Sequence, residues 1–294
     1  MFELMAQSPL LFIAIVFAFA LLVGSFLNVV IYRLPIMMER DWREQAKELE
    51  QMPVNDVPED TFNLVTPRSR CPSCGAEISA IQNIPVLSYL VLRGRCANCQ
   101  AKIGPRYPIV EFVTAVLCAI TAWRFGFGPE AVMAIFMTLM LVPITMIDAD
   151  HQLIPDSLVY PLLWVGLLMS LWHPMASAEV LFIEPREAII GGAVGYLSLW
   201  SVYWLFKIVT GKEGMGHGDF KLLAALGAWL GWQALPIIIL MSAVVGATFG
   251  ILMIVLRGRD RAVPMPFGPF LAAAGWISML YGDAIKSAYF DTLF

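Results

Sequence analysis

The chain has 294 residues and a formal net charge of −4 at pH 7; 59% of its residues are hydrophobic and only 14% are charged. Soluble globular domains carry about 25% charged residues. This composition therefore excludes an ordinary soluble protein and predicts a polytopic, all-α membrane protein. No part of the sequence resembles a nucleic-acid-binding patch, so we expect no nucleic-acid partner.

The first long apolar run covers residues 10–32, enough for a helix that crosses a hydrocarbon core of about 30 Å. Residues 1–7 contain no Lys or Arg, so the run lacks the basic segment of a cleavable signal peptide and is expected to be a retained span. Several basic residues follow within residues 33–47. Because positive charge concentrates in cytoplasmic loops, we expect this end to be cytoplasmic and the N-terminus periplasmic.

Two C-x2-C pairs lie in the polar segment that follows, namely Cys71 with Cys74 and Cys96 with Cys99. Four thiolates at this spacing suit a tetrahedral structural Zn²⁺ site, which leaves no open position for catalysis. Such a metal would stabilise a segment with too few apolar residues for a core of its own. Two disulfides or a redox pair are the alternative, which we favour less because cytoplasmic thiols stay reduced.

Seven further apolar runs predict a total of about eight transmembrane helices. The later runs cover residues 108–123, 131–147, 158–172, 188–208, 220–232, 234–256 and 267–281. The run 220–232 is the shortest and could be a half-span or a re-entrant helix.

Three parts follow from this organisation. Residues 1–33 form the first transmembrane helix, residues 34–107 a small cytoplasmic domain with the Cys₄ zinc site, and residues 108–294 a transmembrane bundle. If the chain crosses the membrane eight times from a periplasmic N-terminus, all but three of its 19 Lys and Arg residues lie on the cytoplasmic side. Because a wrong span count would scramble this separation, it supports the predicted topology.

Two acidic clusters lie at the cytoplasmic ends of spans in this topology. Asp148 ends the run 131–147, and Asp219 ends the glycine-rich loop GMGHGD at residues 214–219. Helix capping is the simpler explanation for Asp219. Two carboxylates within a few ångströms, however, share one proton and can divide acid and base roles as in aspartic proteases. The glycines would let an extended substrate backbone approach the site.

Other polar residues compete for these roles. Asp150 and Asp156 lie close to Asp148 in the sequence, and we expect Asp156 to cap a helix because it precedes an apolar run. His151 and His217 show no metal-ligand spacing and are interpreted as polar loop residues. Glu111 is unusually deep in an apolar run; we expect a first-turn position there, although a functional role stays open. Cys118, inside the run 108–123, is expected to be a small buried side chain.

The chain resembles the type IV prepilin peptidases, bacterial inner-membrane aspartic proteases of the GxGD type, over nearly its whole length. The resemblance is carried by GSFLNV at 24–29, both cysteine pairs, RYP at 106–108 with Glu111, IDADH at 147–151, IPD at 154–156, GHGD at 216–219 followed by KLL at 221–223, and PFGP at 266–269. A lone GxGD would be weak, but several motifs in this order are specific.

The resemblance implies that Asp148 and Asp219 are the catalytic pair and that the substrates are prepilins and pseudopilins, cut after a glycine at the cytoplasmic face. Members with the cysteine domain are usually bifunctional and N-methylate the new N-terminal residue with S-adenosylmethionine. Only the resemblance implies this cofactor, because the sequence contains no strand-flanked G-x-G-x-x-G. Membrane lipid is the other expected partner.

Other classes of function explain less of the sequence. A peptidase without methyltransferase activity is the nearest alternative. A proton-coupled transporter could use the paired aspartates, but the chain shows no internal repeat and both aspartates lie at one membrane face. A zinc-bearing assembly factor would leave the glycine-rich loop unexplained.

Overall fold

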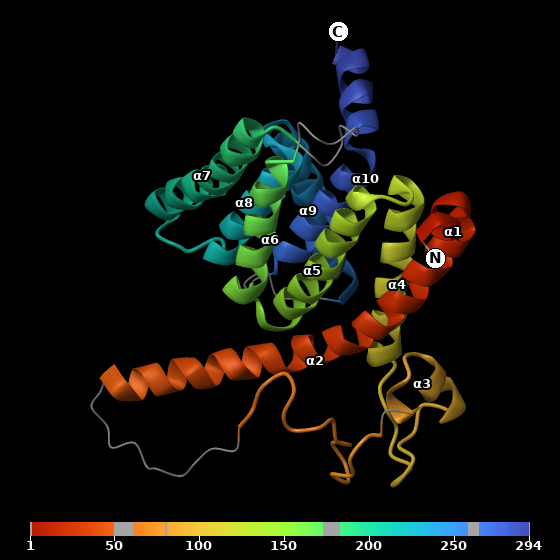
Figure 1. Cartoon of the computed structure of the whole chain (residues 1–294). Helices are drawn as coiled ribbons and strands as arrows, with labels where there is room; N and C mark the ends of the chain where they lie inside the picture. The colour runs from red at the N-terminus through yellow and green to blue at the C-terminus, as the bar shows by residue number, and fades with distance from the viewer. Residues whose placement is uncertain (1, 50–60, 80, 173–182, 258–264, 294) are drawn as a thin grey trace. The chain divides into compact units, whose positions relative to one another are not determined.

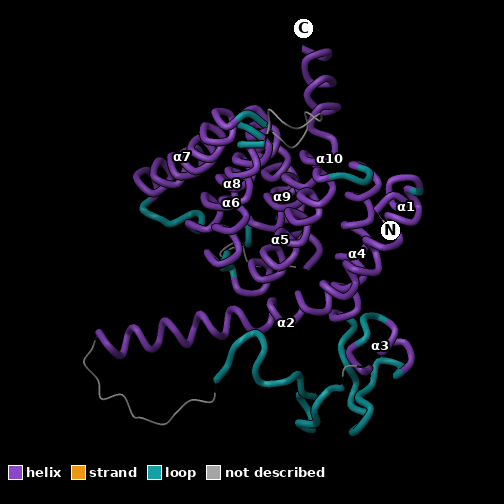
Figure 2. The backbone as a smooth tube through the Cα atoms, viewed as in Figure 1, coloured by secondary structure: helices purple, strands orange, loops and turns teal. Residues whose placement is uncertain are grey.

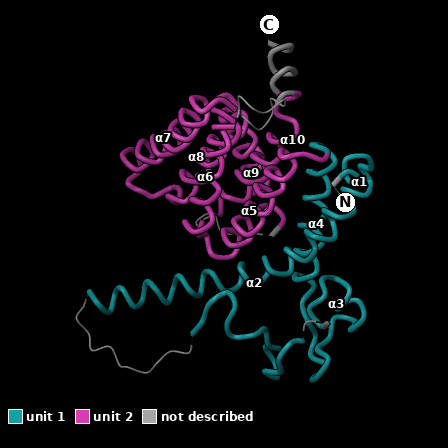
Figure 3. The backbone as a smooth tube through the Cα atoms, viewed as in Figure 1, with its two compact units in different colours: residues 1–126 teal, residues 127–294 magenta. Residues whose placement is uncertain are grey.

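A computed structural model describes residues 2–49, 61–79, 81–172, 183–257 and 265–293 (Figure 1). Within these ranges the regular structure is helical, with only two isolated β-bridges between loop segments (Figure 2). The chain divides into two compact units, residues 1–126 and 127–294 (Figure 3). All eight predicted apolar runs coincide with helices. The bounds predicted for the three domains stay predictions.

Unit 1 is built on two long helices and a loop-rich segment. Its helices are α1 (Phe2–Gln7), α2 (Pro9–Leu49), η1 (Ile81–Asn83), α3 (Leu87–Val91) and α4 (Arg106–Phe125). Helices α2 and α4 pack against each other. They approach closely at Gly24, where a Cβ would lie only 3.0 Å from Cα of Glu111. Small residues at such crossings let helix backbones come together.

The helix that contains the first predicted span does not end at residue 33, where the sequence predicts its end. Helix α2 continues through Pro35 to Leu49, so the charged stretch after the span belongs to the same helix. Proline removes one backbone donor, but good helix formers follow it, and the helix carries on. The apolar pattern marked where the hydrophobic part stops, which differs from where the helix stops.

Unit 2 surrounds one short, buried helix. Its helices are α5 (Pro129–His151), α6 (Asp156–Ser170), α7 (Pro185–Thr210), α8 (His217–Leu230), η3 (Trp232–Ala234), α9 (Leu235–Arg257) and α10 (Gly268–Leu293). From residue 219 to residue 230 every side chain of α8 except Lys221 is buried, against α6, α7 and α10 among others. A helix that is apolar on all sides belongs in a core. Burial on every side stabilises α8 although it has only 14 residues.

Glycines bring α7 and α8 into direct backbone contact. A Cβ on Gly191 would overlap the carbonyl of Gly227, and a Cβ on Gly195 would lie 2.6 Å from the carbonyl oxygen of Leu223. Trp229 of α8 fixes a second crossing, because its Nε1 donates to the carbonyl of Leu162 at 2.7 Å. The position of α8 is therefore set by close contacts on both flanks.

This packing makes a stability prediction that compares two neighbouring glycines. Gly191→Ala is expected to lower the free energy of unfolding by about 1–3 kcal/mol, because the new methyl has no space. Gly192→Ala is the matched control, since the nearest atom to its Cβ would lie at 3.7 Å. Thermal unfolding in detergent measures both. Equal stability of the two variants would contradict the described crossing.

Five helices within the described ranges are long and apolar enough to cross a membrane. They are Pro9–Leu49, Arg106–Phe125, Pro129–His151, Pro185–Thr210 and Trp232–Leu256. Helix α6 is apolar but shorter than these. The chain is thus an all-α membrane protein, and the count of eight spans stays a prediction.

Candidate active site

Asp148 lies in the last turn of α5, with only 5% of the residue exposed. The helix ends there because Gln152 adopts a left-handed conformation (φ 53°) and returns its N–H to the carbonyl of Asp148 at 2.8 Å. Carboxylate Oδ2 of Asp148 accepts the backbone N–H of Gly268 at 2.9 Å. This N–H belongs to the first residue of α10, whose positive end favours a carboxylate.

Asp219 lies in the first turn of α8, and 6% of the residue is exposed. Gly216 is the residue at the cap position and has no side chain to cap the helix, and its backbone N–H acts on the Asp219 carboxylate. Carboxylate Oδ1 is buried and has no hydrogen-bond partner. A buried polar atom without a partner costs about 1–3 kcal/mol. A role at the start of α8 therefore does not account for the unpartnered Oδ1.

Ile154 connects the surroundings of the two aspartates. A Cβ on Gly218 would lie 2.7 Å from Cβ of Ile154, and a Cβ on Gly268 would lie 2.9 Å from its Cδ1. The Ile154 side chain thus touches the glycine that precedes Asp219 and the glycine bonded to Asp148. The two carboxylates are close enough for an electrostatic interaction between them. The structure brings these two predicted residues together at one end of unit 2.

Asp156 does not act as a helix cap. Pro155 is the cap residue of α6 and the helix start has no side-chain capping bond. The carboxylate of Asp156 instead pairs with Lys221, whose Nζ lies 2.6 Å from Oδ1 and 2.8 Å from Oδ2. Lys221 also lies over the ring of Tyr160. This ion pair joins the start of α6 to the first turns of α8 beside the candidate site.

The remaining polar candidates are peripheral. Asp150 and His151 are exposed at the end of α5. His217, the first residue of α8, is exposed and packs against the rings of Tyr203 at 5.2 Å and Phe220 at 5.4 Å. Neither histidine belongs to a metal-binding cluster among the residues that the structure describes.

Glu111 lies in unit 1 and beyond the first turn of α4, contrary to expectation. The residue is buried, and its Oε2 accepts the backbone N–H of Val86 at 2.8 Å. Ser25 and Asn28 of α2 also lie beside this carboxylate. The bond from Val86 and these polar neighbours offset the cost of burying a carboxyl group among apolar residues. In the same helix, the expectation of a buried Cys118 is confirmed.

The four predicted cysteines form one cluster, in which all Sγ atoms lie within 4.8 Å of one another. A tetrahedral zinc site with Zn–S bonds of about 2.3 Å separates its sulfurs by about 3.8 Å. The Sγ atoms of Cys71 and Cys99, one from each pair, are 3.8 Å apart. All five cysteines are free. The donor set and its spacing therefore fit Zn²⁺.

The two cysteine pairs adopt the same local backbone. The N–H of Cys71 bonds the carbonyl of Ala76 at 2.9 Å, and the N–H of Cys96 bonds that of Ala101 at 2.9 Å. Each turn also needs a left-handed residue directly after its second cysteine. Gly75 (φ 71°) and Gln100 (φ 58°) occupy these two positions. The sequence spacing predicted the cluster, but this repeat was not predicted.

Backbone N–H groups also change the pKa values of the cysteine thiols. The backbone N–H of Ser73 lowers the pKa of Cys71, and that of Ala76 lowers the pKa of Cys74. The backbone N–H of Ala101 also acts to lower the pKa of Cys99, but Cys74, burial and the other two sulfurs outweigh it and raise that pKa to about 11. Metal binding at this cluster must therefore release a proton.

Zinc content provides a direct test of the cluster. Cys71→Ser is expected to reduce bound zinc from about one ion per chain to near zero, because a structural site needs all four ligands. Protease cleavage between residues 61 and 105 should then increase, since metal binding stabilises such segments. Cys118→Ser is the control and should keep its zinc. Full zinc content in Cys71→Ser, measured by elemental analysis, would contradict the assignment.

Comparison with known proteins gives the same division of the chain into two parts. Residues 18–125 match the family described as the bacterial Peptidase A24 N-terminal domain, and residues 134–251 match the type IV leader peptidase family. The chain is 52% identical to proteins named prepilin leader peptidase/N-methyltransferase from Stutzerimonas stutzeri and Pseudomonas aeruginosa, covering 98% of this chain and 96% of each relative. A relative of the same name from Aeromonas hydrophila is also 52% identical, over 98% of this chain and 97% of its own. No solved structure matches.

Proposed function

Because the chain belongs to the type IV leader peptidase family, we propose that it removes the basic leader from prepilins and pseudopilins and then N-methylates the new N-terminal residue. Cleavage follows a glycine at the cytoplasmic face of the bacterial inner membrane. The observation that carries the proposal is a pair of buried carboxylates, Asp148 in the last turn of α5 and Asp219 in the first turn of α8.

The two carboxylates act as an aspartic-protease pair. Sharing one proton, one carboxylate takes a proton from water while the other donates its proton to the scissile carbonyl oxygen. Water oxygen then bonds to the carbonyl carbon, and the tetrahedral intermediate collapses as the leaving nitrogen takes a proton. Oδ1 of Asp219 supports this role because it is buried and has no partner, so it is available to water or substrate.

The proposed membrane topology brings the aspartate pair to the face where the substrate leader is exposed. We propose eight spans with the N-terminus in the periplasm, as the distribution of Lys and Arg favours. The end of α5 and the start of α8 then lie at the cytoplasmic face, where the leader of a membrane-anchored prepilin emerges. Proton-coupled transport explains less, because transporter sites usually lie near the bilayer midplane.

Zinc and the methyl donor have different support. We propose that the four clustered cysteines hold a structural Zn²⁺, which stabilises the cytoplasmic segment and takes no part in the chemistry. Methylation with S-adenosylmethionine is supported by the names of the relatives. Two cavities in unit 1 are lined mostly by apolar side chains and do not fit a donor with charged amino-acid and sulfonium groups. No residue is therefore assigned to this cofactor.

Reconstituted cleavage tests the proposal. Purified protein in detergent is incubated with a full-length prepilin, and mass spectrometry locates the cut bond. We expect a single cut after the glycine that ends the leader. Methylation is tested separately on pre-cleaved pilin with S-adenosylmethionine, so that a peptidase without methyltransferase activity is recognised. Folded, zinc-loaded protein that cuts no prepilin would contradict the proposal.

A further inference from the structure

Helix α3 exposes an apolar surface to its surroundings. Leu87 is 61% exposed, Leu90 64% and Val91 80%, and none of the residues of α3 is buried. Ile84 just before the helix is exposed as well. A soluble domain would rarely leave so compact an apolar group open to water, so this surface needs a partner.

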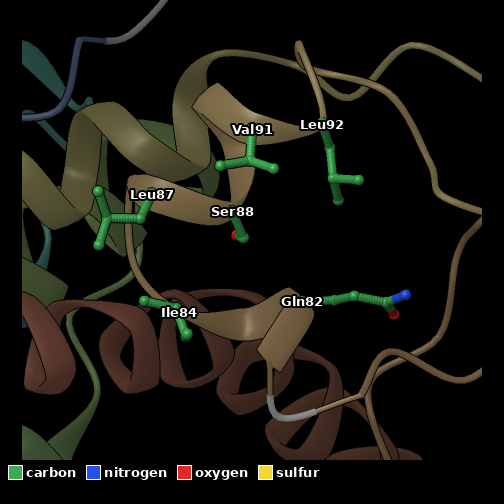
Figure 4. A pocket seen from close by; sticks show the side chains of 6 residues that line it. All are labelled: Gln82, Ile84, Leu87, Ser88, Val91 and Leu92. Carbon is green, nitrogen blue, oxygen red and sulfur yellow. The ribbon is translucent and has the colours of Figure 1, made fainter.

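The apolar surface includes two shallow cavities. Figure 4 shows the first, of about 190 Å³, where Ile84 and Gln82 lie opposite Leu87, Ser88 and Val91. The second, of about 300 Å³, lies between α3 and α4. Its lining residues from the α3 segment and from α4 include Tyr89, Leu90, Ile109, Phe112 and Val113. The apolar surface of α3 therefore continues onto α4.

Helix α4 indicates that the partner of this apolar surface is membrane lipid. It is long and apolar enough to cross a membrane. Ile109, Phe112 and Val113 near its start are all exposed, as lipid-facing side chains are. Because the same cavity touches these residues and α3, the acyl chains that surround the start of α4 would also reach α3.

Polar contacts hold the start of α3 against α4. The Glu111 carboxylate of α4 holds the N–H of Val86, the residue directly before α3, at 2.8 Å. Val86 has a left-handed backbone (φ 57°), which is rare for a β-branched residue and needs such support. Nearby, Nδ2 of Asn28 on α2 donates to the carbonyl of Tyr107 at 3.1 Å.

The charge around α3 matches an anionic membrane surface. From residue 78 to residue 110 the sequence contains no Asp or Glu. Four exposed basic residues lie in this stretch: Arg93, Arg95, Lys102 and Arg106. Basic residues beside an apolar helix are typical of segments that lie in the interface of anionic lipids.

We propose that α3 lies in the cytoplasmic leaflet of the membrane, with Leu87, Leu90 and Val91 among the acyl chains and the following basic residues at the headgroups of anionic phospholipid. The zinc-binding segment is thereby attached to the membrane surface by its own helix as well as by α2 and α4. This inference depends on α4 as a span and on the proposed topology, and it is independent of the proposed chemistry.

Photo-crosslinking in lipid tests this placement. Benzoylphenylalanine replaces Val91 in the full-length protein, reconstituted in vesicles of phosphatidylglycerol and phosphatidylethanolamine. Val65 is the matched control, because it is an apolar residue of unit 1 with 81% exposure against 80% for Val91. Phe112 in α4 is the positive control. Zinc content shows that each variant is folded.

After irradiation, mass spectrometry should find phospholipid attached at positions 91 and 112 and at least about tenfold less at position 65. Lipid at position 112 but not at position 91 would overturn the proposal. Attachment of added prepilin at position 91, with no lipid adduct in its absence, would also overturn it and identify this surface as a substrate site.

Discussion

Asp219→Asn is expected to reduce prepilin cleavage by about 10²–10⁴-fold, the usual contribution of a positioned acid or base. Asparagine keeps the size of the side chain and removes only its ability to exchange a proton. Because Oδ1 of Asp219 is buried without a hydrogen-bond partner, the variant should be about as stable as the parent protein. Cleavage rate and thermal unfolding in detergent are measured on the same samples.

The control for this prediction is Asp150→Asn, an exposed residue close to Asp148 at the end of α5. It should cleave within a few-fold of the parent rate. If Asp219→Asn kept its activity and lost about 1 kcal/mol of stability, the residue would have to be a structural cap after all.

Gly268→Ala is expected to reduce cleavage by about 10²-fold, the cost of displacing a reacting group by roughly 1 Å. A Cβ there would lie 2.7 Å from Oδ2 of Asp148 and 2.9 Å from Cδ1 of Ile154. The carboxylate must move, and its bond to the Gly268 N–H must lengthen. Steady-state kinetics should place the loss in kcat, since the glycine acts on Asp148 and not on binding of the leader.

Gly282→Ala provides the comparison within the same helix, α10. No atom lies within 4 Å of a Cβ at this position, so the variant should keep its activity and stability. Wild-type kcat in Gly268→Ala would show that the contact with Asp148 does not control the reaction.

Much of the candidate site could be predicted from the sequence because its residues are marked locally. Asp148 follows an apolar run, Asp219 ends a glycine-rich loop, and the charge distribution predicts that both lie at one membrane face. The cysteine spacing likewise predicted a cluster that the structure confirms. The catalytic roles of the two aspartates stay predictions until the variants are measured.

The contacts that position these residues could not be predicted, because they join distant parts of the chain. Gly268 meets Asp148 from 120 residues away, and Lys221 pairs with Asp156 across 65 residues. The PFGP stretch at residues 266–269 was noticed, but nothing in it indicates which carboxylate its N–H would bind. Local patterns report burial and turns, whereas such pairings depend on how the helices pack.

The prediction for the start of α6 failed for a related reason. An aspartate before an apolar run usually caps the helix, but Asp156 lies within reach of a half-buried lysine on α8. Charge-assisted hydrogen bonds are stronger than neutral ones, so the two short contacts with Lys221 can outweigh a capping bond. A single sequence does not show that Lys221 faces this way.

Comparison of the single and double aspartate variants tests the central claim most directly. Cleavage is measured for Asp148→Asn, Asp219→Asn and the double variant, each with intact zinc and an unchanged unfolding temperature. Residues that act as one unit lose their function together, so the double variant should be no slower than the slower single variant. Losses that multiply in the double variant, or a single variant with parental activity, would show that the two aspartates do not form one site.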